Sequence, residues 1–172
     1  MSSRLGCFVL GIVATIVVFV GGAYVFLQAG GVSMATSSPP LPLETTVAKM
    51  AIHASFGDAA QVQNPLPFND ANMLAGAKVF SRHCAVCHGL PGQPPTEFSR
   101  GMFPRPPQLF ENNQMVTDDP EGISHWKVTN GIRLSGMPAF GHTLSDTQRW
   151  QVTMLVEHAD KLAPAAKAAL AH

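Results

Sequence analysis

Apolar and polar positions divide the chain into one long apolar run, a proline-rich segment and a series of short amphipathic stretches. The apolar run covers residues 5–27 and contains no charged side chain. A helix of about 23 residues spans about 35 Å, which is enough to cross a bilayer with some tilt. The run therefore predicts a transmembrane anchor over residues 1–28. A cleavable secretory signal is the alternative: its apolar stretch is usually shorter, but the small residues at 33–36 provide a cleavage site.

The charges beside this run indicate its orientation. Arg4 precedes the run, and no positive cluster follows it closely. The positive-inside rule then leaves the N-terminus in the cytoplasm and carries the rest of the chain across the membrane. Cys7 lies inside the run and is interpreted as a small apolar residue facing lipid, with lipidation as the alternative.

Residues 29–68 begin with a stretch rich in Gly, Ser and Pro and are interpreted as a tether. Within them, residues 43–56 predict a short helix, because apolar positions recur there on one helical face. These positions are Val47, Met50, Ala51 and Ala54. We expect this helix to pack against the domain that follows or to lie near the membrane surface.

Residues 69–172 contain the remaining amphipathic stretches and are expected to form one compact domain. Asp70 is placed to cap a helix over residues 71–82, since a short acidic side chain accepts hydrogen bonds from the free N–H groups of a first turn. The C-terminal stretch from Ala163 onward shows no clear amphipathic pattern, and the last predicted helix fades into it.

Two more helix starts follow in this domain. Asp119 is expected to cap a helix whose first residue is Pro120 and which ends at Gly131, in the usual order of an early proline and a late glycine. Ser145, with Gln148 three residues later, forms a capping box at the start of the last helix. The buried face of that last helix is expected to contain Trp150, Met154 and Leu155.

The chain shows no alternating strand pattern and no internal repeat, so the predicted fold class is all-α, with short helices joined by long loops. Long loops in a small domain need something to pack against. A large apolar cofactor would fill the space between them.

The charge balance limits the classes of partner. The chain has 11 basic and 11 acidic residues; without Arg4, 10 basic residues remain against the same 11 acidic ones, a net charge of about −1 beyond the membrane. A nucleic-acid-binding domain has a basic patch, so a nucleic-acid partner is not expected.

The main candidate functional residues are Cys84, Cys87 and His88, which form a C-x-x-C-H sequence. A structural zinc site needs four nitrogen or sulfur ligands, typically from two such pairs, and here there is one pair. A thioredoxin-like dithiol follows a strand and opens a helix, whereas this pair follows a predicted helix. C-x-x-C-H is the signature of covalent haem c attachment, in which the thiols add to two vinyl groups and the histidine reaches the iron.

A haem iron held by one histidine has a second axial position to fill. Met137, about 50 residues after His88, lies in a loop between Gly136 and Pro138 and is the first candidate. Met102 is the second candidate, and His125 or His142 is the third. Four other methionines, Met50, Met73, Met115 and Met154, are expected to pack in the core.

Taken together, "CAVCHG", "NGIRLSGMPAFG" and a final amphipathic helix resemble the single-haem class I cytochromes c over residues 69–157. The resemblance implies a small cytochrome c-like domain around one covalently bound haem c, preceded by one transmembrane helix. It gives Cys84 and Cys87 the thioether bonds, His88 the proximal ligand position and Met137 the distal one.

The resemblance also implies supporting residues. In the family a proline carbonyl accepts a hydrogen bond from the free nitrogen of the proximal histidine, and Pro106 or Pro107 would fill that role. Trp126 and Arg133 are candidate donors to the haem propionates, with a core tryptophan and an exposed arginine as the alternatives.

The anchor makes the chain similar to membrane-tethered cytochromes of bacteria, with the haem domain on the periplasmic side of the inner membrane. The resemblance implies an electron carrier rather than an enzyme. Its partners would be a membrane-bound donor such as a quinol-oxidising complex and an acceptor such as a terminal oxidase or reaction centre. The alternatives are a fixed haem subunit of a larger complex, and a peroxidase or gas sensor with a labile Met137.

Overall fold

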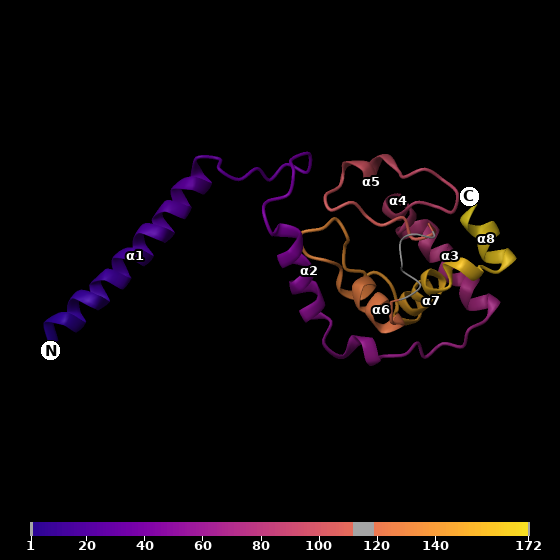
Figure 1. The fold of residues 1–172 in the computed structure, drawn as a ribbon. Helices are drawn as coiled ribbons and strands as arrows, with labels where there is room; N and C mark the ends of the chain where they lie inside the picture. The colour runs from indigo at the N-terminus through magenta and orange to yellow at the C-terminus, as the bar shows by residue number, and fades with distance from the viewer. Residues whose placement is uncertain (1, 112–118, 172) are drawn as a thin grey trace. The chain divides into compact units, whose positions relative to one another are not determined.

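The computed structural model describes residues 2–111 and 119–171, in which all the regular secondary structure is helical and no strand is present. The all-α fold predicted from the sequence is confirmed. The described chain divides into two compact units, Met1–Pro42 and Leu43–His172 (Figure 1). The core prediction for Met115 falls outside the described residues.

The first unit contains α1 (Ser2–Gln28). Its part from Arg4 to Gln28 is long and apolar enough to cross a membrane, and none of it is buried. A signal sequence near an N-terminus has the same properties. Large apolar side chains such as Phe19 are exposed along its length, as a helix surrounded by lipid requires.

The second unit begins with α2 (Glu44–Ser55) and the 3₁₀-helix η1 (Gly57–Gln61). The predicted helix over 43–56 is confirmed, but it has no buried residue. Met50 is 67% exposed, so its predicted place in the core is wrong. The reason is that α2 continues into η1, and η1 makes the contact with the rest of the unit.

The contact of η1 is with α6 (Glu121–Asn130). Gly122 permits it, because a Cβ there would lie 1.9 Å from Ala59 O and 2.6 Å from Val62 O. The Phe56 ring also meets the Trp126 ring edge-on, with centroids 5.3 Å apart. Whereas the sequence places residues 29–68 in a tether, the structure includes residues 43–68 in the second unit.

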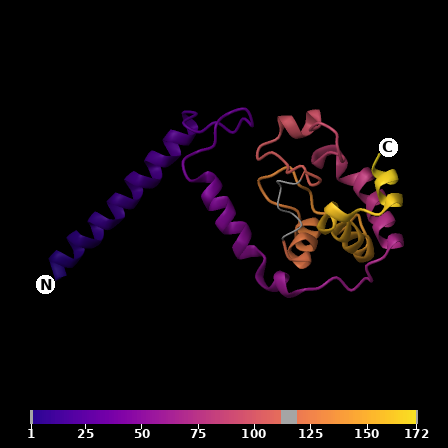
Figure 2. The ribbon, with the colours of Figure 1, turned by 45° about the vertical axis from the view of Figure 1, so that its right-hand side comes forward.

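The core of the second unit lies where α3 (Asp70–His83), α7 (Asp146–Glu157) and α8 (Pro164–Leu170) meet (Figure 2). A Cβ on Gly76 of α3 would lie 2.2 Å from Gln151 O of α7, so the two backbones approach closely. The largest fully buried apolar side chains are Phe80, Met73, Met154, Leu155 and Leu170. The burial predicted for Met73 and Met154 is confirmed.

The sequence did not predict α8. Its residues Ala166 and Leu170 are buried, and Ser81 of α3 donates a hydrogen bond of 3.0 Å to Ala169 O. Packing against α3 therefore orders a segment whose own pattern is weak.

The predicted caps are right in one case and displaced by one residue in two others. The capping box of Ser145 and Gln148 is present at the start of α7. The cap of α3 is Asn69 rather than Asp70, and its side chain accepts from Asn72 N. At α6 the cap is Pro120, so the helix begins one residue later than predicted.

Three short helices complete the described part of the second unit: α4 (Ala85–His88), α5 (Glu97–Gly101) and the 3₁₀-helix η2 (Ala159–Lys161). The first continues almost directly from α3, and the second lies between α4 and α6.

Candidate cofactor site

The C-x-x-C-H sequence lies at the junction of α3 and α4. Cys84 N donates to Phe80 O at 2.8 Å, and Cys84 O accepts from Cys87 N at 3.0 Å and from His88 N at 2.9 Å. These bonds make one tight turn that continues from α3. The two thiols and the imidazole are therefore fixed by a helix that is packed in the core.

His88 is oriented by a carbonyl group from the loop that follows. Its Nδ1 lies 2.8 Å from Pro107 O, so Nδ1 carries the proton and Nε2 is left with a free lone pair. The neighbouring carbonyl, Pro106 O, instead accepts from Gln108 Nε2 at 3.3 Å. Burial lowers the pKa of His88, against the opposite effect of the Pro107 carbonyl. A neutral, oriented imidazole is the form that binds a metal.

The two cysteines have no disulfide between them. Burial, and secondarily the neighbouring Cys87, raises the pKa of the Cys84 thiol to about 12. A redox-active dithiol needs a lowered pKa, because the thiolate is the nucleophile. Within residues 2–111 and 119–171, no three His, Cys, Asp or Glu side chains are grouped as a metal site requires. Neither the dithiol nor the zinc alternative is supported by this geometry.

Cys84, Cys87 and His88 open onto a cavity of about 860 Å³, its mouth included. Its walls are mainly apolar and come from α3, the 102–109 segment, α6, the 132–140 segment and α7. The apolar wall residues are Phe80, Met102, Pro104, Pro106, Pro107, Leu109, Val128, Ile132, Met137, Pro138, Phe140, Val152 and Val156.

Met137 reaches this cavity on the loop between α6 and α7, residues 131–145, which we call the methionine loop. Met137 N donates to Ser135 Oγ at 3.2 Å, and Met137 O accepts from Ile132 N at 3.2 Å. Gly131 has a φ of +67°, and a Cβ there would lie 2.8 Å from Met137 O. The backbone around Met137 is thus folded tightly on itself.

Met102 borders the same cavity. Its methyl carbon would lie 1.8 Å from a Cβ on Gly136, so it packs directly against the backbone before Met137. The structure therefore brings the first and second candidates for the distal ligand to one place. The other two candidates do not line the cavity: His125 stacks on Trp150 with ring centroids 3.8 Å apart, and His142 is exposed.

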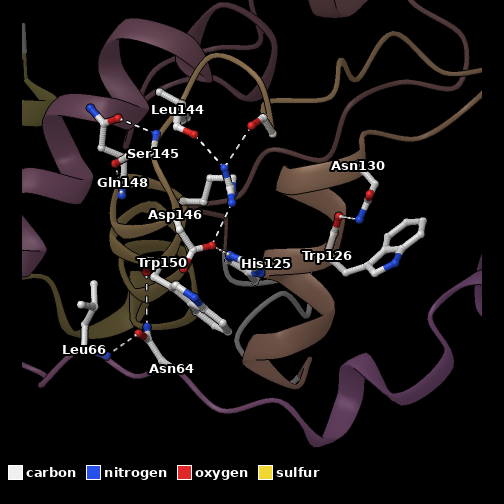
Figure 3. A network of polar contacts seen from close by, with 12 residues as sticks. Asn64, Leu66, His125, Trp126, Asn130, Leu144, Ser145, Asp146, Gln148 and Trp150 are labelled. Atoms are coloured by element: carbon white, nitrogen blue, oxygen red, sulfur yellow. Dashed lines mark hydrogen bonds and ion pairs between the residues drawn. The ribbon is translucent and has the colours of Figure 1, made fainter.

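Trp126 and Arg133 do not line the cavity. Trp126 packs on Phe56, and its carbonyl accepts from Asn130 Nδ2 at 2.9 Å (Figure 3). Arg133 is exposed. The sequence prediction missed Arg105, which does line the cavity and brings a permanent positive charge to it. The sequence feature that could have identified Arg105 is its position between Pro104 and Pro106, in the segment that supports His88.

The residues at this cavity fit a haem c group. Two thiols spaced for two vinyl groups, a neutral imidazole, a thioether and a mainly apolar surround meet at one cavity. Haem c with histidine and methionine ligands uses this combination.

Comparison with known proteins agrees with this chemistry. Residues 71–154 match the family model described as "Cytochrome C oxidase, cbb3-type, subunit III". No curated protein matches the chain. Haem c in this class is bound covalently and transfers electrons. This match identifies a c-type cytochrome domain over residues 71–154, which is consistent with a monohaem class I cytochrome c.

Proposed function

We propose that this chain is a membrane-anchored electron carrier in which Cys84 and Cys87 hold one haem c, with His88 and Met137 as its axial ligands. The observation that carries the proposal is that all four side chains border one cavity and that Pro107 O fixes the tautomer of His88. Arg105, in the same lining, is suited to pair with a carboxylate group of the cofactor.

The attachment needs no oxidant. On attachment, each S–H would add across one vinyl C=C bond: the sulfur would bond to one carbon, the proton would go to the neighbouring carbon, and no group would leave. The burial that raises the pKa of Cys84 keeps that thiol protonated before attachment. Haem c supplies an iron that alternates between Fe(III) and Fe(II).

With His88 and Met137 both bound to the iron, no substrate would need to reach the metal, which would distinguish a carrier from a peroxidase. Burial keeps His88 neutral, and Pro107 O accepts the Nδ1 proton so that Nε2 is free to bind a metal. The thioether of Met137 favours the ferrous state and raises the potential. The apolar walls of the cavity exclude water, which also raises the reduction potential.

The anchor determines where this carrier works. A retained α1 would keep the domain at the outer face of a bacterial inner membrane, with membrane-bound donor and acceptor complexes as partners. Confinement near the membrane raises the effective concentration of such partners. The mass of the mature protein purified from membranes tests retention, because cleavage at residues 33–36 would remove α1.

The experiment that tests the carrier function is exposure of the ferrous holoprotein to carbon monoxide. A carrier with both ligands in place binds carbon monoxide slowly and weakly, and Met137→Ala binds it rapidly. Rapid binding by the wild type, together with peroxide turnover, would contradict the carrier function and favour the catalytic or sensing alternative.

The second candidate function is that of a fixed haem subunit in a larger complex. Two observations favour it: the matching family is described as a subunit of an oxidase, and α2 has no buried residue in the isolated chain. Mild-detergent extraction followed by size-exclusion chromatography separates the two candidates. A free carrier elutes alone, whereas a fixed subunit elutes with its complex at high salt.

A further inference from the structure

Arg149 connects α7 to the end of the methionine loop. Its Nη1 donates to Leu144 O at 2.7 Å and to Gly141 O at 3.3 Å. The two carbonyls belong to the last turn of the loop, just before the cap of α7. One planar guanidinium thus joins two backbone groups that α7 itself does not bond.

The Arg149 side chain is held in this position from the other side. Its Nη2 lies 2.8 Å from Asp146 Oδ1, and only 13% of the Arg149 side chain is exposed. His125 Nε2 lies 3.3 Å from the same oxygen, and its ring is stacked on Trp150 (Figure 3). Burial lowers the pKa of His125, so it is neutral near pH 7 and Arg149 is the cation that balances Asp146.

The carbonyls that Arg149 binds follow Met137 closely in the chain. Between them the loop is pinned at two further points, since Phe140 N donates to Val128 O and Gly141 N to Thr129 O, both at 3.0 Å. These two bonds tie the loop to α6, whereas the Arg149 bonds tie it to α7. Loss of Arg149 would remove the hydrogen bonds from its guanidinium to Gly141 O and Leu144 O, and would leave the two backbone hydrogen bonds to α6 and the packing of Leu144 in the core.

We infer that Arg149 is a positioning residue for the distal ligand: by binding Gly141 O and Leu144 O it holds the methionine loop closed and Met137 at the cavity. The inference rests on the proposed role of Met137. Arg149 touches neither Met137 nor the cofactor cavity, so its effect is on how often the loop opens, not on the ligand itself.

Imidazole titration of the ferric holoprotein measures this opening. Imidazole can occupy the distal position only when Met137 has left it, so the apparent Kd falls in proportion as the open fraction rises. For Arg149→Met we expect an apparent Kd about tenfold lower than in the wild type, because charge-assisted hydrogen bonds are lost. For Arg149→Lys we expect an apparent Kd between those of Arg149→Met and the wild type, since an ammonium group keeps the charge but lacks the planar arrangement of donors in a guanidinium group.

The control is Gln151→Leu, two residues further along α7. Gln151 Nε2 donates to Asn72 Oδ1 of α3 at 3.0 Å and does not touch the loop. It is expected to change the denaturation midpoint but to leave the imidazole Kd within about twofold. Asp146→Asn, which leaves Arg149 without its carboxylate, is expected to lower the Kd by about threefold.

Four outcomes decide the inference. A lower Kd in Arg149→Met that disappears in the Met137→Ala background supports it. Equal Kd values in Arg149→Met, Gln151→Leu and wild type overturn the positioning role while leaving the ligand assignment intact. A fall in Kd that persists in the Met137→Ala background also overturns it. An imidazole Kd unchanged by Met137→Ala shows instead that Met137 is not the ligand, and both proposals then fail.

Discussion

The two walls of the cavity are held in place by different means. One, the attachment wall, consists of α3, α4 and residues 104–109, and places His88 by a helical turn plus one hydrogen bond that His88 Nδ1 donates to Pro107 O. The other is the methionine loop, in which Met137 is placed by turns within the loop and by contacts with α6 and α7. The first depends mostly on neighbours in sequence, the second on contacts between helices.

This difference separates two properties of an electron carrier. The attachment wall decides whether the cofactor is bound at all, because its bonds to the chain would be covalent. On the proposed ligation, the methionine loop would decide how the iron behaves, because Met137 would be held only by non-covalent contacts, which can open locally. Changes in the first are expected to abolish the holoprotein, and changes in the second to alter its spectrum, potential or stability.

The largest effect is expected from removing the attachment wall's thiols. The double variant Cys84→Ser, Cys87→Ser has no sulfur to bond the vinyl groups, so we expect no haem to remain with the chain under denaturing conditions. Intact mass and haem staining of a denaturing gel measure this. Cys7→Ser is the control and should retain haem fully; retention by the double variant would contradict the attachment.

A large effect on the methionine loop is expected from Gly131→Ala. Gly131 combines a φ of +67° with backbone atoms of residues 137–139 at 2.7–2.8 Å from a new Cβ, so the loop must shift. We expect a loss of about 2–4 kcal/mol of unfolding free energy. Gly92→Ala is the matched control: its φ is +71° but nothing lies within 4 Å, so about 1–2 kcal/mol is expected. Equal losses in denaturant unfolding would remove the argument for close packing at Gly131.

A moderate, pH-dependent effect is expected at Glu157, which joins the two helices that flank the methionine loop. Glu157 is 8% exposed and accepts a hydrogen bond from Ser124 of α6. Burial raises its pKa from 4.5 to about 7, against the effect of Ser124; Asp119 and Glu121 raise it further, and Lys127 lowers it. Between these pH values the folded state holds a proton that the unfolded state has released, so stability falls as pH rises from about 4.5 to about 7.

Glu157→Gln removes this dependence. The amide keeps the size of the side chain and its contact with Ser124, but it has no charge to bury. We expect the variant to lack the decline in stability and to be about 1–3 kcal/mol more stable than the wild type at pH 8. Unfolding measured from pH 4 to pH 8 tests this, with the exposed Glu97→Gln as control. If the stability of Glu157→Gln still falls with rising pH as in the wild type, the fall must come from other titratable groups.

The smallest effect is expected at Leu134, at the tip of the methionine loop. Leu134 has a φ of +61° and is 86% exposed, so a bulky side chain occupies a left-handed conformation without burial to offset it. Asn adopts this conformation more readily. We expect Leu134→Asn to raise the unfolding free energy by about 1 kcal/mol, measured by denaturant titration. A loss of stability would mean that Leu134 makes a contact that its exposure does not reveal.

The sequence predicted best what depends on neighbouring residues. The capping box of Ser145 and Gln148 works within one helical turn, and it is present. The all-α fold and the haem c group followed from helical periodicity and from the C-x-x-C-H sequence. Each of these signals is local, so no knowledge of distant contacts was needed.

Features decided by distant contacts were not predictable in the same way. The pattern of α8 is weak because α3 supplies its packing partner. Trp126 and Phe56 are 70 positions apart, and only the close approach at Gly122 brings them together. Pro106 and Pro107 carry the same local signal, so only the three-dimensional course of the loop gives one of them the contact with His88.

The most direct test of the account is the ferric optical spectrum of the holoprotein beside those of Met137→Ala and Met102→Ala. An iron–thioether bond gives a weak long-wavelength charge-transfer band that depends on the axial ligand. If His88 and Met137 share the iron, the band is present in the wild type and in Met102→Ala and absent from Met137→Ala. A band that survives Met137→Ala, or one that is lost in Met102→Ala alone, would contradict the account and move the distal ligand to Met102.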